Sequence, residues 1–304
     1  IQYVNQLFNP LIDVMQNYSV LQTSMVAAER VFEIMDRTDY EPEQDNQDLQ
    51  IQDGSIEFKH ISFSYDGKRD VLRDISFSVK KGQTIAFVGS TGSGKSSIIN
   101  LFLRFYEFER GQILIDGRDI KDFSQEELRR KIGLVLQDPF LYHGTVASNI
   151  QLYQEQLTRE EIIEAAKFVD AHGFISQLPQ GYDAPVTERG ATFSSGQRQL
   201  LAFARTIATK PKILILDEAT ANIDSETEEL IQASLRKMRR GRTTIAIAHR
   251  LSTIQDADCI YVLDKGCIIE SGSHEELLAQ DGTYKKMYQL QAGMMEFWRK
   301  PDYK

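Results

Sequence analysis

The segment Gly89-Ser90-Thr91-Gly92-Ser93-Gly94-Lys95-Ser96 constrains the fold of this chain more than any other feature of its sequence. It matches the phosphate-loop pattern GxxxxGK[ST] at every fixed position. A short apolar run, Ile85–Val88, precedes the loop, and a helix is expected to follow over Ser97–Arg104. A strand, a glycine-rich loop and a helix in this order predict an α/β domain of the P-loop type.

The loop has the chemistry of a site for nucleotide phosphates. Its glycines allow backbone N–H groups to turn inward, and the N-terminus of the following helix adds the positive end of its dipole. Lys95 can reach the β- and γ-phosphates, and the Ser96 hydroxyl can ligate Mg²⁺. We therefore expect a continuous nucleotide-binding stretch that consists of Gly89, Ser90, Thr91, Gly92, Ser93, Gly94, Lys95, Ser96 and Ser97.

A second apolar strand ends in two acidic residues. Ile213–Leu216 is followed by Asp217 and Glu218. The carboxyl ends of parallel strands are where open α/β sheets bind ligands, so these carboxylates are expected beside the phosphate loop. Asp217 can hold Mg²⁺, and Glu218 can orient and deprotonate an attacking water.

Strands and helices alternate from about Ser55 onward. Buried strands between helices predict a mostly parallel sheet that is covered on both faces. Alternating apolar and polar residues over Ile56–Tyr65 and Ile75–Val79 predict an added antiparallel β-subdomain. A helical subdomain is expected over about residues 138–210, with a helical region over about Thr158–His172 that opens with a capping box of Thr158 and Glu161. Further strands are expected at Thr84–Val88, Ile113–Asp116, Ile132–Leu136, Lys212–Leu216, Thr243–Ala248 and Cys259–Leu263.

Residues 1–36 are expected to form one long helix that precedes the globular domain. Its apolar residues recur at alternating steps of three and four, a pattern typical of helices packed side by side. Because no other segment offers a matching run, we expect this helix to pack on something outside the chain; the alternative is that it lies on its own domain. The polar residues 37–54 are expected to be a linker, and residues 55–304 the globular domain.

A third motif narrows the class of nucleotide-binding protein. Residues 193–197 read Phe-Ser-Ser-Gly-Gln and resemble the signature motif of ABC ATPases, whose usual form is Leu-Ser-Gly-Gly-Gln. The preceding run Thr187-Glu188-Arg189-Gly190 is similar to a loop of ABC exporters. A serine and small residues at a helix N-terminus also suit an anion. The resemblance implies that a second nucleotide, shared with a partner, contacts Ser194, Ser195, Gly196 and Gln197.

The resemblance covers nearly the whole chain and implies further roles. Tyr65 resembles the aromatic residue that stacks on adenine, and Asp224 lies in the segment that resembles the D-loop. Gln137 resembles the Q-loop glutamine, and His249 the switch histidine. The implied cofactors are ATP and Mg²⁺, with Ser96, Gln137 and Asp217 on the metal and Glu218, His249 and Gln137 in catalysis.

The sequence departs from the family pattern in its signature. Phe193 replaces the usual leucine, and Ser195 replaces the first of two glycines, so the side chain of Ser195 can crowd a phosphate or alter backbone freedom. The pattern resembles heterodimeric bacterial multidrug exporters, in which one subunit keeps the catalytic glutamate and has a weakened signature. We therefore expect a second half-transporter subunit as partner; a homodimer that tolerates both residues is the alternative.

Residues 1–36 are similar to the end of the last transmembrane helix of an exporter. The resemblance implies an ATPase that powers efflux of drugs or other hydrophobic compounds from the cytoplasmic face of the plasma membrane, joined to its own transmembrane domain. The alternatives are a homodimeric lipid flippase or peptide exporter and, with less support, an ABC ATPase of DNA repair. The chain begins at Ile1 without an initiator Met, in an expected helix, so we expect a piece of a longer chain. It has no run of 18 or more apolar residues, so no complete membrane-spanning helix is expected in it.

Net charge argues against nucleic acid as a partner. The formal charge is -9, which gives no general attraction to DNA or RNA. Cys259 and Cys267 form no CxxC pair, so two reduced core cysteines are expected.

Overall fold

A six-stranded sheet carries the phosphate loop. Its strand order is β12-β11-β3-β10-β9-β6, with β12 antiparallel to β11 and the other neighbours parallel. The central strands are buried along nearly their whole length, as expected where helices or a second sheet cover both faces. The strands are β3 (Thr84–Gly89), β6 (Ile132–Val135), β9 (Ile213–Asp217), β10 (Thr243–Ile247), β11 (Cys259–Asp264) and β12 (Cys267–Gly272).

The computed structural model describes residues 2–37, 49–152, 154, 156–187, 190, 192–217, 225–247, 251 and 254–299. The chain divides into two compact units, Ile1–Asp45 and Asn46–Lys304. The division falls inside the segment 37–54 that was expected to be a linker. The last residues of that segment belong to the second unit, because Ile51 is buried in its core.

The described residues of the first unit, 2–37, form the helix α1 (Gln2–Met35). The apolar residues that recur at steps of three and four are exposed on this helix, among them Leu11, Tyr18 and Met25. Pro10 lies inside the helix. Among the described residues, no helix combines the length and the apolar character that crossing a bilayer requires.

A four-stranded antiparallel sheet forms the predicted β-subdomain. Its order is β2-β1-β4-β5, with β1 (Ile56–Phe63), β2 (Leu72–Val79), β4 (Arg110–Ile115) and β5 (Arg118–Asp119). Alternate side chains of β1 and β2 point into a core shared with β3, where Phe58 and Phe77 stack with ring centroids 4.4 Å apart. Strand β1 ends at Phe63, two residues earlier than expected, so Tyr65 lies in the following turn.

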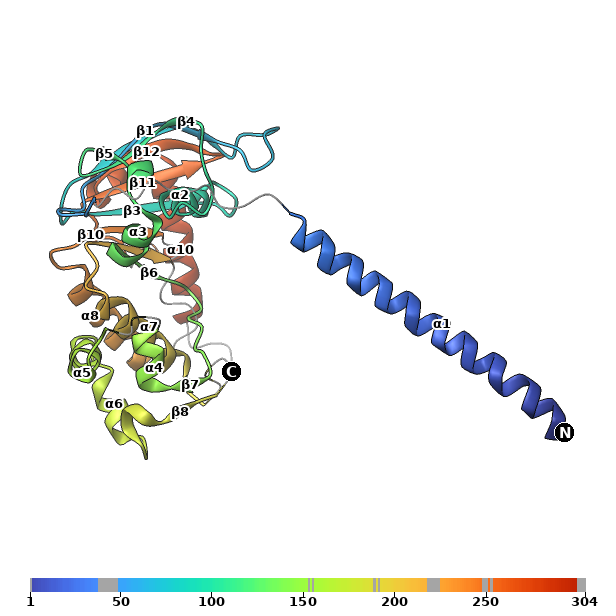
Figure 1. Ribbon diagram of the computed structural model, residues 1–304. Helices are drawn as coiled ribbons and strands as arrows, with labels where there is room; N and C mark the ends of the chain where they lie inside the picture. The colour runs from blue at the N-terminus through green and yellow to red at the C-terminus, as the bar shows by residue number, and fades with distance from the viewer. Residues whose placement is uncertain are drawn as a thin grey trace. The chain divides into compact units, whose positions relative to one another are not determined.

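Helices cover the six-stranded sheet and form the predicted helical region. In Figure 1, α4 to α7 lie together with the short β7–β8 pair, and β1 and β4 lie at the opposite end of this unit. The helices are α2 (Lys95–Phe102), α3 (Gln125–Lys131), α4 (Val146–Gln151), α5 (Arg159–Phe168), α6 (His172–Gln177), α7 (Ser195–Ala208), α8 (Ser225–Arg239), α9 (His274–Ala279) and α10 (Thr283–Arg299). The minor elements are β7 (Gly144–Thr145), β8 (Pro185–Val186) and two 3₁₀ turns, Ile120–Asp122 and Gly181–Asp183.

The helical region expected over Thr158–His172 contains α5, which ends at Phe168, and then a break before α6 begins at His172. Its start is as expected, since Thr158 and Glu161 form a reciprocal capping box. The break follows from Asp170, which has a φ of 61° and therefore leaves the helical conformation. The Asp170 carboxylate accepts hydrogen bonds from Lys237 at 2.5 Å and from Ser234 at 3.4 Å, so contacts with α8 hold the break in place.

Two carboxylates attach residues 51–55 to the second unit. Asp116, in the turn between β4 and β5, accepts hydrogen bonds from the backbone N–H groups of residues 52, 53, 54 and 55 at 2.8 to 3.1 Å. Glu127 of α3 accepts a fifth from the N–H of Ile51 at 3.1 Å. These five donors fix the path by which the chain reaches β1.

Candidate functional site

The phosphate loop connects β3 to α2, as the sequence predicted. Gly89 ends β3 with a φ of 155°, and a Cβ atom there would lie 2.3 Å from the carbonyl oxygen of Leu263. Such an approach excludes every side chain, so glycine is required at this position. The loop then turns through a hydrogen bond from Ser93 N to Ser90 O at 3.1 Å and enters α2 at Lys95.

The Lys95 ammonium lies inside the loop. Its Nζ donates to the carbonyl oxygens of Gly89 at 2.8 Å and Ser90 at 3.0 Å, and Lys95 is only 5% exposed. The neighbouring Ser96 is exposed at the N-terminus of α2. An ammonium group fixed at a helix N-terminus creates a positive potential, which favours the binding of an anion.

The turn between β11 and β12 contacts the phosphate loop. This contact was not expected from the sequence. Gly266 N donates to Ser93 O at 3.0 Å, and Gly266 O accepts from Arg73 N at 2.8 Å. A Cβ atom at Gly266 would lie 2.2 Å from the carbonyl oxygen of Val71. The dipeptide Lys265-Gly266 between two strands was the available turn signal.

Asp217 and Gln137 lie at the same edge of the sheet as the phosphate loop. Asp217 is the last residue of β9 and is level, through β10, with Phe87 of β3. One strand separates β9 from β3, so their backbones are about 10 Å apart. Gln137 is exposed and follows β6, the parallel neighbour of β9 on its other side.

The oxygen atoms at this edge suit magnesium. Ser96, Gln137 and Asp217 offer a hydroxyl, an amide carbonyl and a carboxylate, and Mg²⁺ prefers oxygen ligands. Within the described ranges, histidine, cysteine, aspartate and glutamate form no cluster of three or more that could hold a metal. The three oxygen donors Ser96, Gln137 and Asp217 fit the ligand chemistry of Mg²⁺.

Three of the expected site residues lie outside the described residues: Glu218, Asp224 and His249. Glu188 and Arg189 of the run before the signature also lie outside them. The sequence places Glu218 directly after β9 and His249 two residues after β10.

Tyr65 lies in the turn after β1, with its ring against α2. Its hydroxyl donates to Ser97 Oγ at 3.0 Å and accepts from Asn100 Nδ2 at 3.2 Å. The rings of Phe63 and Tyr106 meet it edge-on, each with its centroid 4.8 Å away. The contacts of Asn100 and Tyr106 with Tyr65 were not expected from the sequence. The one sequence feature that relates Asn100 to the site is that it follows Ser97 by three residues, on the same helix face.

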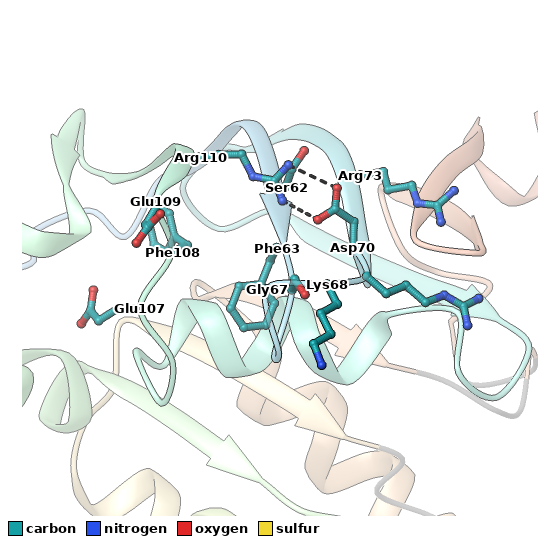
Figure 2. Close-up of a pocket in the computed structure, with 12 residues that line it drawn as sticks. Ser62, Phe63, Gly67, Lys68, Asp70, Arg73, Glu107, Phe108, Glu109 and Arg110 are labelled. Atoms are coloured by element: carbon teal, nitrogen blue, oxygen red, sulfur yellow. Dashed lines mark hydrogen bonds and ion pairs between the residues drawn. The ribbon is translucent and has the colours of Figure 1, made fainter. Parts of the chain in front are cut away.

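The turn that carries Tyr65 borders a cavity of about 720 Å³ (Figure 2). Figure 2 shows Asp70 paired with Arg110 of β4 across this cavity. Within the turn, Asp66 accepts hydrogen bonds from the N–H groups of Lys68 at 2.9 Å and Arg69 at 3.2 Å. Backbone hydrogen bonds lower the pKa of Asp66, and the hydrogen bond from Arg110 lowers the pKa of Asp70.

The segment that resembles the signature begins α7. Ser194 caps this helix, since its hydroxyl accepts from Gln197 N at 3.2 Å while Gln197 Oε1 accepts from Ser194 N at 3.0 Å. Phe193 is buried, with its ring 6.4 Å from that of Phe174. Ser195 is the first helical residue and is partly exposed, so its backbone needs no special glycine conformation.

The phosphate loop and the signature segment are anchored in different cores. Ile98 and Phe102 of α2 pack in the core between the two sheets. Leu200 and Phe203 of α7 pack in the core of the helical region. The structure therefore brings the loop, Gln137 and Asp217 to the six-stranded sheet and places Tyr65, which follows β1 of the other sheet, against α2. Ser194–Gln197 are presented from another part of the unit.

Comparison with known proteins agrees with this arrangement. The family model described as ABC transporter matches residues 72–221. A Streptococcus pneumoniae protein, exp8, provisionally named an ABC transporter ATP-binding protein, is 70% identical over 295 residues, which cover 97% of this chain and 50% of exp8. The Bacillus subtilis protein YheH, provisionally named a multidrug resistance ABC transporter ATP-binding/permease protein, is 50% identical over 96% of this chain and 43% of YheH.

A solved structure is similar along nearly the same length. A bacterial Atm1-family ABC exporter with ATP bound superposes with a TM-score of 0.80 and 41% identity, over 95% of this chain and 51% of that one. The chain thus spans about half the length of the relatives it matches. Domains of this kind are ATPases coupled to transport. The chain belongs to the ABC transporter family and carries its ATP-binding domain.

Proposed function

We propose that this chain is the ATP-hydrolysing motor of an ABC exporter. The observation that carries the proposal is the juxtaposition at one sheet edge of the enclosed Lys95 ammonium, Asp217 and Gln137. A cation for phosphates and oxygen ligands for Mg²⁺ are what phosphoryl transfer requires, because it depends mainly on positioning and electrostatic stabilisation.

Each site residue has a role in this proposal. The loop Gly89–Ser97 binds the phosphates, and Tyr65 stacks on the adenine. Ser96, Gln137 and Asp217 would hold Mg²⁺, which would supply positive charge to neutralise the β- and γ-phosphates. Glu218 orients and deprotonates the attacking water, and His249 contacts the γ-phosphate.

The proposed partner is a second half-transporter subunit. ATP would lie between the phosphate loop of one subunit and the signature segment of the other, with Ser194–Gln197 and Asp224 of this chain facing the partner's nucleotide. Phe193 is buried, so it fills core space and does not face a nucleotide. Because residue 195 is helical, we attribute the expected weakening of the signature segment to the side chain of Ser195 and not to lost backbone freedom. The proposed assembly is therefore a heterodimer in which one of the two nucleotide sites hydrolyses ATP fast.

The full-length protein is proposed to export drugs or other hydrophobic compounds, with this domain on the cytoplasmic face of the plasma membrane. Support comes from the relative YheH, which is named as a multidrug resistance ATP-binding/permease protein. The exposed apolar residues of α1 are consistent with packing against a transmembrane domain. A homodimeric lipid flippase or peptide exporter is the competing reading, since no described residue of this chain identifies the cargo.

The test is ATP turnover by the full-length protein in lipid, alone and mixed with its candidate partner, with Glu218→Gln as control. Turnover in the mixture alone, abolished by Glu218→Gln, is the expected result. Brisk turnover by this subunit alone would replace the heterodimer with a homodimer. Turnover that survives Glu218→Gln would refute the assignment of the catalytic base.

A further inference from the structure

The Tyr65 ring is held by two aromatic neighbours while much of the residue stays exposed. Phe63 of β1 and Tyr106 each meet it in a T-shaped arrangement, at centroid distances of 4.8 Å. Tyr65 is nevertheless 47% exposed. A nucleobase stacks on an aromatic ring, so a ring that is held by its neighbours and is still accessible is suited to receive one.

The hydrogen bonds of the Tyr65 hydroxyl complete this support. Asn100 Nδ2 can only donate, so the phenol oxygen accepts from it at 3.2 Å and must donate its own proton elsewhere. That proton goes to Ser97 Oγ at 3.0 Å. Ser97 accepts this bond, and its own proton remains available for another acceptor such as a phosphate oxygen. Sharing Ser97 with Tyr65 is therefore compatible with nucleotide binding.

The backbone under Tyr65 is also held in place. The carboxylate of Asp66 accepts two backbone N–H groups of its own turn, and Asp70 pairs with Arg110 of β4 (Figure 2). Val71 N donates to Phe63 O at 2.7 Å and closes the turn. Side-chain and backbone contacts together leave the ring little freedom before any ligand arrives.

We propose that Asn100 is a positioning residue that holds the Tyr65 ring as a preformed platform for the nucleobase. The proposal rests on the proposed function, in which Tyr65 stacks on adenine. A platform ordered in advance lowers the entropy lost when the base binds. Removing the Asn100 contact should therefore weaken the affinity for nucleotides and leave the affinity for the phosphate chain alone unchanged.

The experiment measures equilibrium binding to the full-length protein, at low temperature, of Mg·ATP and of Mg·tripolyphosphate, which has phosphates but no base. The variants are Asn100→Leu, which is similar in size but cannot donate, Tyr65→Phe, which keeps the ring but lacks the hydroxyl, and the double variant. Tyr65→Ala reports on stacking itself. Tripolyphosphate binding serves in every variant as the measure of an intact phosphate loop.

Asn100→Leu should raise the Kd for ATP about two- to tenfold, the equivalent of one hydrogen bond. Tyr65→Phe should raise it at least as much, because this variant removes the Asn100 contact and the hydrogen bond to Ser97 as well. The double variant should resemble Tyr65→Phe, because that variant already lacks the Asn100 contact. Tyr65→Ala should raise the Kd about five- to 150-fold. The Kd for tripolyphosphate should stay unchanged throughout.

Three results would overturn the proposal. Unchanged ATP affinity in Asn100→Leu would show that the contact does not position the ring. Tighter ATP binding would show that the contact holds the ring in an unproductive place. Equal losses for ATP and tripolyphosphate would assign Asn100 to the stability of α2. A wild-type protein that binds neither ligand, or a Tyr65→Ala variant with normal ATP affinity, would instead refute the proposed function on which the inference rests.

Discussion

Replacing Asn149 with leucine should destabilise the helical region, because its side chain joins three segments. Asn149 lies on α4 and is 1% exposed. Its Oδ1 accepts from Tyr142 N at 2.8 Å and from Arg205 of α7 at 3.1 Å. Its Nδ2 donates to the carbonyl oxygens of Tyr142 at 2.8 Å and Thr145 at 3.0 Å. Residue 149 thus links the segment that follows Gln137 to the signature helix.

The expected loss in the free energy of unfolding depends on which groups lose a hydrogen-bond partner in Asn149→Leu. Arg205 keeps hydrogen bonds to the backbone oxygens of residues 149 and 140, and Thr145 O keeps the Ser148 hydroxyl. Four bonds at about 1 kcal/mol each set the gross loss. Burial of the leucine side chain returns about 1.5 to 3 kcal/mol. The net loss in the free energy of unfolding should be about 1 to 2.5 kcal/mol.

Urea unfolding of the chain measures this difference, provided that the m-value stays constant. Gln151→Leu on the same helix is the matched control, because Gln151 makes one long hydrogen bond of 3.5 Å and should cost less than about 0.5 kcal/mol. A loss below about 1 kcal/mol for Asn149→Leu would refute the view that this network stabilises the region.

Three further outcomes are expected. Gly89→Ala should abolish ATP binding, because its Cβ would meet a backbone carbonyl at 2.3 Å; isothermal titration with ATP, beside thermal unfolding to check the fold, tests this. Ser195→Gly should raise ATP turnover of the assembled transporter by restoring a second working site, and an unchanged rate would contradict the asymmetric dimer. The folded pKa of Asp66 lies below 3.8, so its stabilisation of the turn is present above pH 3.8 and is lost as the pH falls through the folded value. Hydrogen exchange should then show protection of the Lys68 and Arg69 amides that declines below pH 3.8, and Asp66→Asn should remove this pH dependence.

Local features of the sequence predicted the parts of the site that depend on neighbouring residues. The phosphate loop and the helix start at Thr158 were correct because glycine geometry and capping act within a few residues. The contact of Tyr65 with Asn100 spans 35 residues and depends on how the β1–β2 turn lies against α2. No periodicity or motif encodes that placement.

The same limit explains two other differences. The helix break at Asp170 is held by side chains of α8, more than 60 residues later. Phe193 departs from the family motif, but only the packed structure shows that its ring is in a core. Sequence patterns give the type of element well and the long-range partners of single side chains poorly.

The attachment of residues 51–55 has a mechanical consequence. A pull along the chain from its N-terminal side reaches β1 only through this stretch, where five N–H donors are held by Asp116 and Glu127. Hydrogen bonds that share a load in parallel each carry only part of it, so the attachment resists small forces. Tension along the chain would therefore act on the β4–β5 turn and on α3. Asp116→Ala would remove the acceptor of four of the five N–H groups and make this attachment more flexible.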